Sequence, residues 1–178
     1  MRWNLSPRFA LSVLATLLTA AASHAADIAK AKQLMTLMRA DEVVAGAMKT
    51  GLRNNKTGIS LSDAQLACLN AVPHSEFSDV VTKALAEGLT NDEVAAAITF
   101  YRTPAGTHYV KTIVALMQGA PVEALGNDEA TQVREFASSP VGDKLLKKAL
   151  IPNSNVVADK MAQVSGDAIE KCAKAAAP

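Results

Sequence analysis

Apolar residues recur at intervals of three and four along most of the chain, and no convincing alternating run of strand type interrupts them. This spacing places apolar side chains on one face of a helix. The sequence therefore predicts an all-α fold, a compact bundle of short helices in which sequential neighbours run antiparallel. A helix capped by Asp27 is expected to bury Ile28 and Leu34. A second helix, from Asp41, is expected to turn Val44 and Ala47 inwards.

Two stretches of the chain repeat at an offset of 36 residues, 91–111 and 127–147. The identical pairs are Asn91/Asn127, Asp92/Asp128, Glu93/Glu129, Phe100/Phe136, Pro104/Pro140, Gly106/Gly142 and Lys111/Lys147. Chance similarity from composition gives roughly one or two matches in 21 positions, so seven mark a genuine repeat. We interpret the two stretches as helical hairpins over about residues 90–118 and 126–150.

The repeat predicts a tight corner between two helices. Thr103 is expected to cap the second helix of the first hairpin, and Pro104 suits the first helical position because it has no N–H to satisfy. Gly106 lacks a Cβ atom and allows close helix contact. The equivalent residues in the second stretch are Ser139, Pro140 and Gly142, and the two repeated aromatic residues, Phe100 and Phe136, are expected in the core.

The first 25 residues predict a secretory signal peptide. Arg2 and Arg8 supply a basic start, and Phe9 to Ala22 form an uncharged, mostly apolar run. Small residues at 23 and 25 fit a cleavage site after Ala25, although an uncleaved membrane anchor is the alternative reading. Cleavage would leave residues 26–178 as a single all-helical domain with no transmembrane segment. We expect this product to be soluble and periplasmic, with secretion from the cell less favoured.

Composition narrows the possible partners. Cleavage removes Arg2 and Arg8 from the 18 basic residues and leaves 16, against 17 acidic residues, so no excess of positive charge favours nucleic acid. The aromatic residues that remain are Phe77, Phe100, Tyr101, Tyr109 and Phe136. Because aromatic side chains dominate many ligand pockets, this small number favours a helical binding surface over an active site.

Two cysteines, Cys68 and Cys172, follow the predicted signal peptide. An even number of cysteines in an exported protein favours a disulfide. A metal site is disfavoured because neither cysteine has a histidine at ligand spacing. We therefore expect one structural disulfide and no metal.

The segment from Leu89 to Glu93, followed by Phe100 to Gly106, resembles the signature of the domain of unknown function 2059 family. The earlier segment from Gln33 to Glu42 is similar to the opening helix and corner of that family. The resemblance extends over about residues 28–118, and the second hairpin, to about residue 150, looks like an extension of it. It implies a small, exported, all-helical bacterial protein, and it implies no reaction.

Few residues suggest catalysis. Phosphate-binding loops, nucleophile elbows and zinc-binding helix motifs do not occur in the sequence, so we expect no cofactor. A role at a helix start explains His74. The enzymatic alternative is a small envelope-acting hydrolase that uses His108 with a carboxylate.

Our leading prediction is a non-enzymatic periplasmic protein that acts by protein–protein interaction through a helical surface. The surface candidates are Tyr101, Arg102, His108 and Tyr109, because Tyr and Arg are frequent interface anchors. Tyr109 aligns with Leu145 in the repeat, and a core position is the alternative for it. The predicted partner is a protein, for example a secreted effector or toxin that an immunity-type inhibitor would block, or a second copy of this chain.

Overall fold

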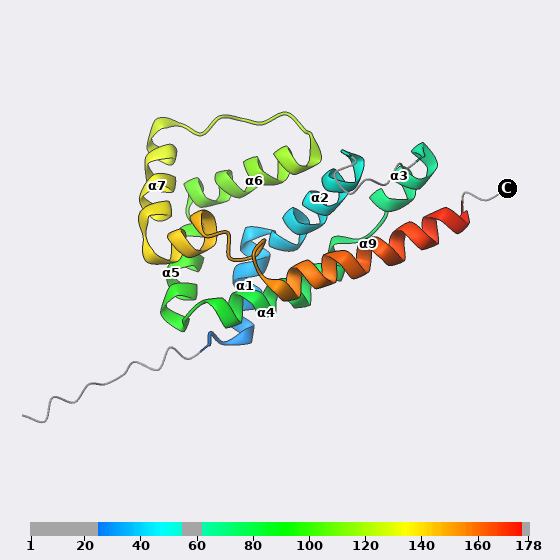
Figure 1. The fold of residues 1–178 in the computed structure, drawn as a ribbon. Coiled ribbons are helices and arrows are strands. Elements are labelled where there is room, and N and C mark those ends of the chain that lie inside the picture. The colour runs from blue at the N-terminus through cyan, green and yellow to red at the C-terminus, as the bar shows by residue number, and fades with distance from the viewer. Residues whose placement is uncertain (1–24, 55–61, 176–178) are drawn as a thin grey trace, which may run out of the picture.

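The computed structural model describes residues 25–54 and 62–175, and its regular elements in these ranges are helices (Figure 1). In chain order they are α1 Ile28–Met38, α2 Ala40–Arg53, α3 Asp63–Asn70, the 3₁₀ turn η1 His74–Phe77, α4 Ser78–Gly88, α5 Asn91–Tyr101, α6 Pro104–Gln118, α7 Asn127–Ser138, α8 Pro140–Gly142, the π-helical segment η2 Asp143–Lys147, and α9 Asn155–Ala175. The predicted all-α fold is confirmed.

Side-chain caps begin the early helices, and the cap by Asp27 is the one that the sequence predicts. The Asp27 carboxylate accepts hydrogen bonds from the first turn of α1, and the Ser62 hydroxyl accepts one from the Gln65 N–H at the start of α3. Within α1, Leu34 is fully buried and packs towards α4 and α5. The prediction that Ile28 is buried was wrong, since 59% of its surface is exposed at the free end of the helix.

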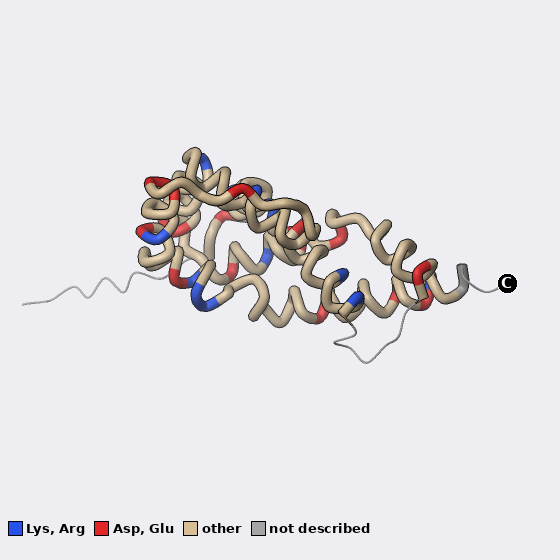
Figure 2. The backbone as a smooth tube through the Cα atoms, turned by 90° about the horizontal axis from the view of Figure 1, so that it is seen from above, with Lys and Arg blue, Asp and Glu red and all other residues tan. Residues whose placement is uncertain are grey.

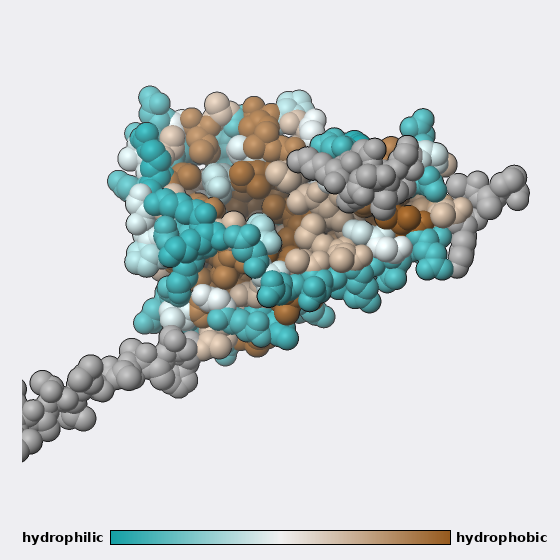
Figure 3. Space-filling model, in the orientation of Figure 1, coloured by the Kyte–Doolittle hydropathy of each residue, from teal (hydrophilic) through white to brown (hydrophobic). Residues whose placement is uncertain are grey.

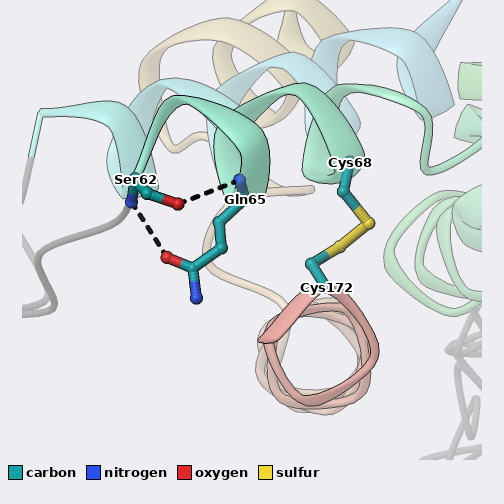
Figure 4. Close-up of a disulfide and its surroundings, with 4 residues drawn as sticks. All are labelled: Ser62, Gln65, Cys68 and Cys172. Carbon is teal, nitrogen blue, oxygen red and sulfur yellow. Dashed lines mark hydrogen bonds between the residues drawn. A yellow bond between two sulfur atoms is a disulfide. The ribbon is translucent and has the colours of Figure 1, made fainter. Parts of the chain in front are cut away.

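A disulfide joins Cys68 on α3 to Cys172 near the end of α9 (Figure 4). The two Cα atoms lie 5.7 Å apart and the residues are separated by 104 positions. In the chain-entropy model, closing a loop of this length stabilises the folded state by about 4–5 kcal/mol. The predicted pairing is confirmed, and it fixes one end of the longest helix.

The disulfide is consistent with an extracytoplasmic protein, because such bonds persist in oxidising compartments. Across residues 25–54 and 62–175, no helix has the length and apolar character needed to cross a membrane. The predicted signal peptide, residues 1–25, lies outside the described residues except for Ala25, so its cleavage stays a prediction.

The two predicted corners have the same hydrogen bonds. In the first, the Thr103 hydroxyl donates to the carbonyl oxygen of Phe100 and accepts from the Gly106 N–H. In the second, Ser139 makes the corresponding bonds to Phe136 and Gly142. A Cβ atom on either glycine would overlap the backbone of the preceding helix, which explains why both positions are glycine. We call residues 90–118 the first corner unit and residues 126–147 the second.

The two units contact each other reciprocally. α5 of the first unit packs against α8 of the second, and α6 of the first packs against α7 of the second. Because α7 is the repeat equivalent of α5 and α8 that of α6, each contact joins the first helix of one unit to the second helix of the other. The Phe100 and Phe136 rings, at the same repeat position, stack with centroids 3.9 Å apart and planes 4° from parallel. Two copies of one structure meet in this way across a two-fold axis. The repeat is therefore also visible in the contacts between the units.

The polar side-chain contacts between the units follow the same exchange. Glu93 of the first unit pairs with Lys144 of the second at 2.8 Å. Glu129 of the second unit pairs with His108 of the first, also at 2.8 Å. Glu93 and Glu129 occupy one repeat position, and His108 and Lys144 occupy another. Each unit thus supplies one carboxylate to the other.

The second unit is not the full hairpin that the sequence predicts over residues 126–150. Its second arm, α8 with η2, covers residues 140–147 only, whereas α6 has 15 residues. A π-helical turn and the left-handed residue Ala149, with a φ of 49°, end the arm. The shortened arm leaves part of α6 without a helical neighbour on that side.

Candidate functional site

A groove of about 310 Å³ lies between α2, α6, η2 and the beginning of α9. Figure 3 shows the apolar surface, in brown, around a hollow in the middle of this face of the molecule. We call this site the central groove. Its lining residues are Met38, Ala40, Val43, Val44, Ala47, Tyr101, Tyr109, Val110, Ile113, Leu145, Leu146, Ile151, Pro152, Val157 and Met161. None of these side chains carries a charge.

The α2 side of the central groove is a regular stripe. Ala40, Val43, Val44 and Ala47 follow the spacing of a helix face that packs against another helix. Val44 is buried beneath the groove, whereas Ala47 is exposed within it. The prediction that Ala47 turns inwards was wrong, because its side chain is exposed and lines a hollow where we expected a packed neighbour.

Both corner units contribute the same repeat positions to the opposite walls. Tyr109 and Val110 come from α6, and their equivalents Leu145 and Leu146 come from η2. On α6 the wall continues to Ile113, one turn further. Because η2 ends at Lys147, the second unit offers no matching extension, and α9 closes this side through Val157 and Met161.

Two of the residues that line the central groove, Tyr101 and Tyr109, carry hydroxyl groups. Tyr101 is 2% exposed, and its buried hydroxyl has no hydrogen-bond partner among the described residues. Burial raises the pKa of Tyr101 well above its usual value, and the nearby Tyr109 adds to this effect. Burial likewise raises the pKa of the half-buried Tyr109. Both phenols are therefore neutral at physiological pH, which suits an apolar site.

The structure separates the four surface residues that the sequence singles out. Arg102 is exposed beyond the corner, whereas Tyr101 belongs to the core beneath the central groove. Tyr109 lines the groove and is only half-buried, so it serves the core and the surface at once. His108 points to α7 and not to the groove. The corner therefore does not bring these residues together as one patch.

The His108–Glu129 pair meets one requirement of the hydrolase alternative, a carboxylate within hydrogen-bond reach. Glu129 accepts hydrogen bonds from the Gly126 N–H and from His108, and both lower the pKa of its carboxyl group. The other imidazole nitrogen, Nε2, is buried without a partner among the described residues, and His108 does not line the central groove. A substrate could not approach that nitrogen in this arrangement.

A second histidine also binds a carboxylate. His74 Nδ1 lies 2.9 Å from Asp41, which is buried and also accepts a hydrogen bond from the Ser78 hydroxyl at 2.8 Å. The serine donates to the aspartate and not to the histidine, so the cluster lacks the proton relay of a serine nucleophile. It ties α2 to η1 and α4, which is a structural role and agrees with the helix-start interpretation of His74.

Sequence reasoning missed most of the central groove, namely Met38, the α2 stripe and the α9 wall.

In the described ranges, no group of three His, Cys, Asp or Glu side chains could hold a metal ion.

Comparison with known proteins supports the family resemblance over part of the chain. Residues 75–122, from η1 through the end of α6, match a family model described as "Uncharacterized protein conserved in bacteria (DUF2059)". The match includes the first corner unit, but neither the opening helices from residue 28 nor the second unit. Searches of curated proteins and of solved structures found no match.

Proposed function

We propose that this protein is a non-enzymatic periplasmic binding protein that acts by protein–protein interaction, and that the central groove is the middle of its binding surface. Inhibition of a toxin by an immunity-type mechanism is one form of this proposal. The observation that carries the proposal is the groove itself: a hollow of about 310 Å³ whose apolar walls come from segments far apart in the chain.

Exposed apolar surface favours binding because it is costly to leave in water. Val43, Ile113 and Met161 are each partly exposed around the hollow, and they come from three different helices. Leu116, one turn beyond Ile113 on α6, is 55% exposed and extends the apolar strip. Interface anchors are typically apolar side chains that fill such hollows and are surrounded by polar residues.

Local features of the groove walls do not serve stability. A π-helical turn supplies Leu145 and Leu146, and such turns occur frequently at functional sites. Ala149, two residues after that segment, has a left-handed backbone that is unfavourable for a residue with a Cβ atom. The buried hydroxyl of Tyr101 has no partner in the part of the chain that the structure describes. Unfavourable features concentrated at one place are typical of a site kept for function.

Site-specific crosslinking tests the proposal. A photo-reactive amino acid replaces Ile113 in the groove, and in a matched protein it replaces Glu87, an exposed residue of α4 that lies outside the groove. Irradiation in the native cell envelope is expected to yield a discrete protein adduct from position 113 and none from position 87. Mass spectrometry then identifies the partner and the crosslinked segment.

A blocking substitution provides the control for the groove. Ala47 is exposed within it, so Ala47→Phe fills the hollow without disturbing the packed side of α2. Ala96→Phe places the same side chain at an exposed position of α5 outside the groove. The adduct at position 113 should disappear with Ala47→Phe and persist with Ala96→Phe. No adduct, or equal adducts from positions 113 and 87, would refute a groove-centred interaction.

A further inference from the structure

We infer that the central groove binds an unbranched aliphatic chain of about a dozen carbon atoms. This inference rests on the proposed function for the position of the site, and it names the chemical group that enters it. The chain can belong to a free lipid or to an acyl group carried by a partner protein, and the two sources share the chemistry argued here.

The size of the groove sets the length of the chain. A cavity of about 150 Å³ in a protein core accommodates benzene, which has six carbon atoms. The central groove is about 310 Å³, roughly twice that volume, so about twelve carbon atoms fill it. This volume also lies at the lower end of the range for small-molecule sites.

The lining determines the chemical class. Thirteen of the fifteen lining residues are Ala, Val, Leu, Ile, Met or Pro, and the other two are the neutral tyrosines. No charged side chain of residues 25–54 and 62–175 lines the groove, so a charged group placed inside would lose its hydration without gaining an ion pair with them. The apolar part of the ligand therefore lies in the hollow, and any polar head group stays outside.

The walls favour a flexible chain over a rigid ring system. Met38 and Met161, on α1 and α9, contribute unbranched side chains that adjust to irregular shapes. The α2 stripe runs along the hollow from Ala40 to Ala47, and the short side chains of its two alanines leave space in the groove. Small and unbranched side chains in these walls adjust to the shape of an extended aliphatic chain.

The two tyrosines allow a direct measurement, because Tyr101 and Tyr109 are the only tyrosines of the chain and both line the groove. In the full chain with Trp3→Phe, which removes the only tryptophan, intrinsic fluorescence reports the groove alone. The protein is titrated with octanol, decanol, dodecanol and tetradecanol. We expect saturable binding whose affinity rises about fourfold per methylene group, as burial of each CH₂ requires, and stops rising beyond dodecanol.

Matched variants locate the binding. Ala47→Phe in the Trp3→Phe background is expected to weaken dodecanol binding at least tenfold, whereas Ala96→Phe leaves it unchanged. A circular dichroism melt of each variant verifies folding. Should Ala47→Phe fail to fold, Val43→Leu reduces the hollow more gently and should weaken dodecanol more than octanol.

A short peptide with an N-terminal dodecanoyl group, compared with the same peptide without it, distinguishes the two sources of the chain. Tight binding of the acylated peptide relative to dodecanol indicates a lipid-modified partner, and equal binding indicates recognition of the chain alone; both support the inference. Absence of saturable binding by either ligand, or binding without dependence on chain length, overturns it. A protein adduct at position 113 would still stand in that case, so the two proposals fail separately.

Discussion

The first corner unit, α5 with α6, and the second, α7 with α8 and η2, have the same corner hydrogen bonds but different surroundings. Five residues of α5 are buried, whereas Phe136 is the one buried residue of α7. The first unit is part of the core, and the second is attached to its outside. A corner motif thus fixes the angle between two helices but not the depth at which they pack.

The difference in the second arms creates the candidate site. α6 continues for 15 residues, and the equivalent arm of the second unit ends after residue 147. The shorter arm supplies Leu145 and Leu146 to the central groove and no residue that matches Ile113 of α6. The repeat therefore contributes to the candidate site where the lengths of its two second arms differ.

The largest loss of stability is expected where the second unit packs against the first. Phe136 stacks on Phe100 and makes an edge contact with Tyr101, at 5.4 Å between centroids. Phe136→Ala should lower the free energy of unfolding by about 3–5 kcal/mol, because it removes a buried ring and leaves a cavity. Urea denaturation measures the loss. Hydrogen exchange should show protection lost in α7 and retained in α5.

Val133→Ala is the control for that prediction. Val133 also lies on α7 and is only partly buried, so this substitution should cost much less than Phe136→Ala. Equal costs, or equal loss of exchange protection in α5 and α7, would show that the second unit is an integral part of the core.

The next effect concerns the corners themselves. A Cβ atom on Gly106 or Gly142 would overlap the carbonyl oxygen of Phe100 or Phe136. Overpacking of this kind costs typically about 1–3 kcal/mol. We expect Gly106→Ala near the upper end, because α5 is held by the core, and Gly142→Ala near the lower end, because α7 can shift outwards. Chemical denaturation of both variants gives the comparison.

Gly51→Ala controls for the general effect of replacing a helical glycine. Nothing lies within 4 Å of a Cβ atom at this position of α2, so alanine should be neutral or stabilise the helix. A larger cost for Gly142→Ala than for Gly106→Ala would mean that the clash, and not the surrounding packing, determines the penalty.

A smaller effect is expected where the two arms end. α6 ends at Gly119, with a φ of 66°, and the second arm is followed by Ala149, with a φ of 49°. Glycine adopts this backbone without strain, whereas alanine does not. Ala149→Gly should therefore stabilise the protein by about 0.5–1 kcal/mol, and Gly119→Ala should destabilise it by about 1 kcal/mol.

Thermal unfolding followed by circular dichroism measures both changes as shifts in Tm of a few degrees. A decrease in Tm for Ala149→Gly would show that Ala149 is not strained and that the short arm ends there without cost.

The local structure of the fold could be predicted from the sequence, because short-range interactions determine it. Asp27, Ser62 and Thr103 cap helices, and each of their partners lies within three residues. Gly106 and Gly142 stood out as a repeated pair, and the compartment argument paired the two cysteines correctly. Packing between distant helices was not accessible in the same way.

The central groove shows why the site was not predicted. Ala47 belongs to the inward stripe of α2, but periodicity cannot tell whether a stripe meets a helix or a hollow. The outcome depends on η2, which ends about a hundred residues later in the chain. Tyr101 looked like a surface anchor because tyrosine is a frequent interface residue, yet it lies on the buried side of the last turn of α5. Only the contacts between units fix these positions.

The smallest change in stability is expected for the Glu93–Lys144 ion pair between the units, and the dependence of stability on pH tests it. Burial alone raises the pKa of Glu93, but hydrogen bonds from Lys144 and Thr90 outweigh it and lower the pKa below the ordinary value of 4.5. The folded state therefore binds fewer protons than the unfolded state near this pH. The stability that the pair contributes is present above about pH 4.5 and is lost as the pH falls through the lower folded pKa.

Lys144→Met removes the cation that lowers the pKa of Glu93 and keeps the aliphatic stem. Between pH 5 and pH 3, the free energy of unfolding of this variant should fall less steeply than that of the wild type, by about 0.5 kcal/mol, since Lys144 is partly exposed to solvent. Lys147→Met, on a more exposed lysine of the same segment, should leave the acid dependence close to that of the wild type. Parallel curves for the wild type and Lys144→Met would show that water screens the Glu93–Lys144 pair, and that this pair does not help to hold the second unit in place.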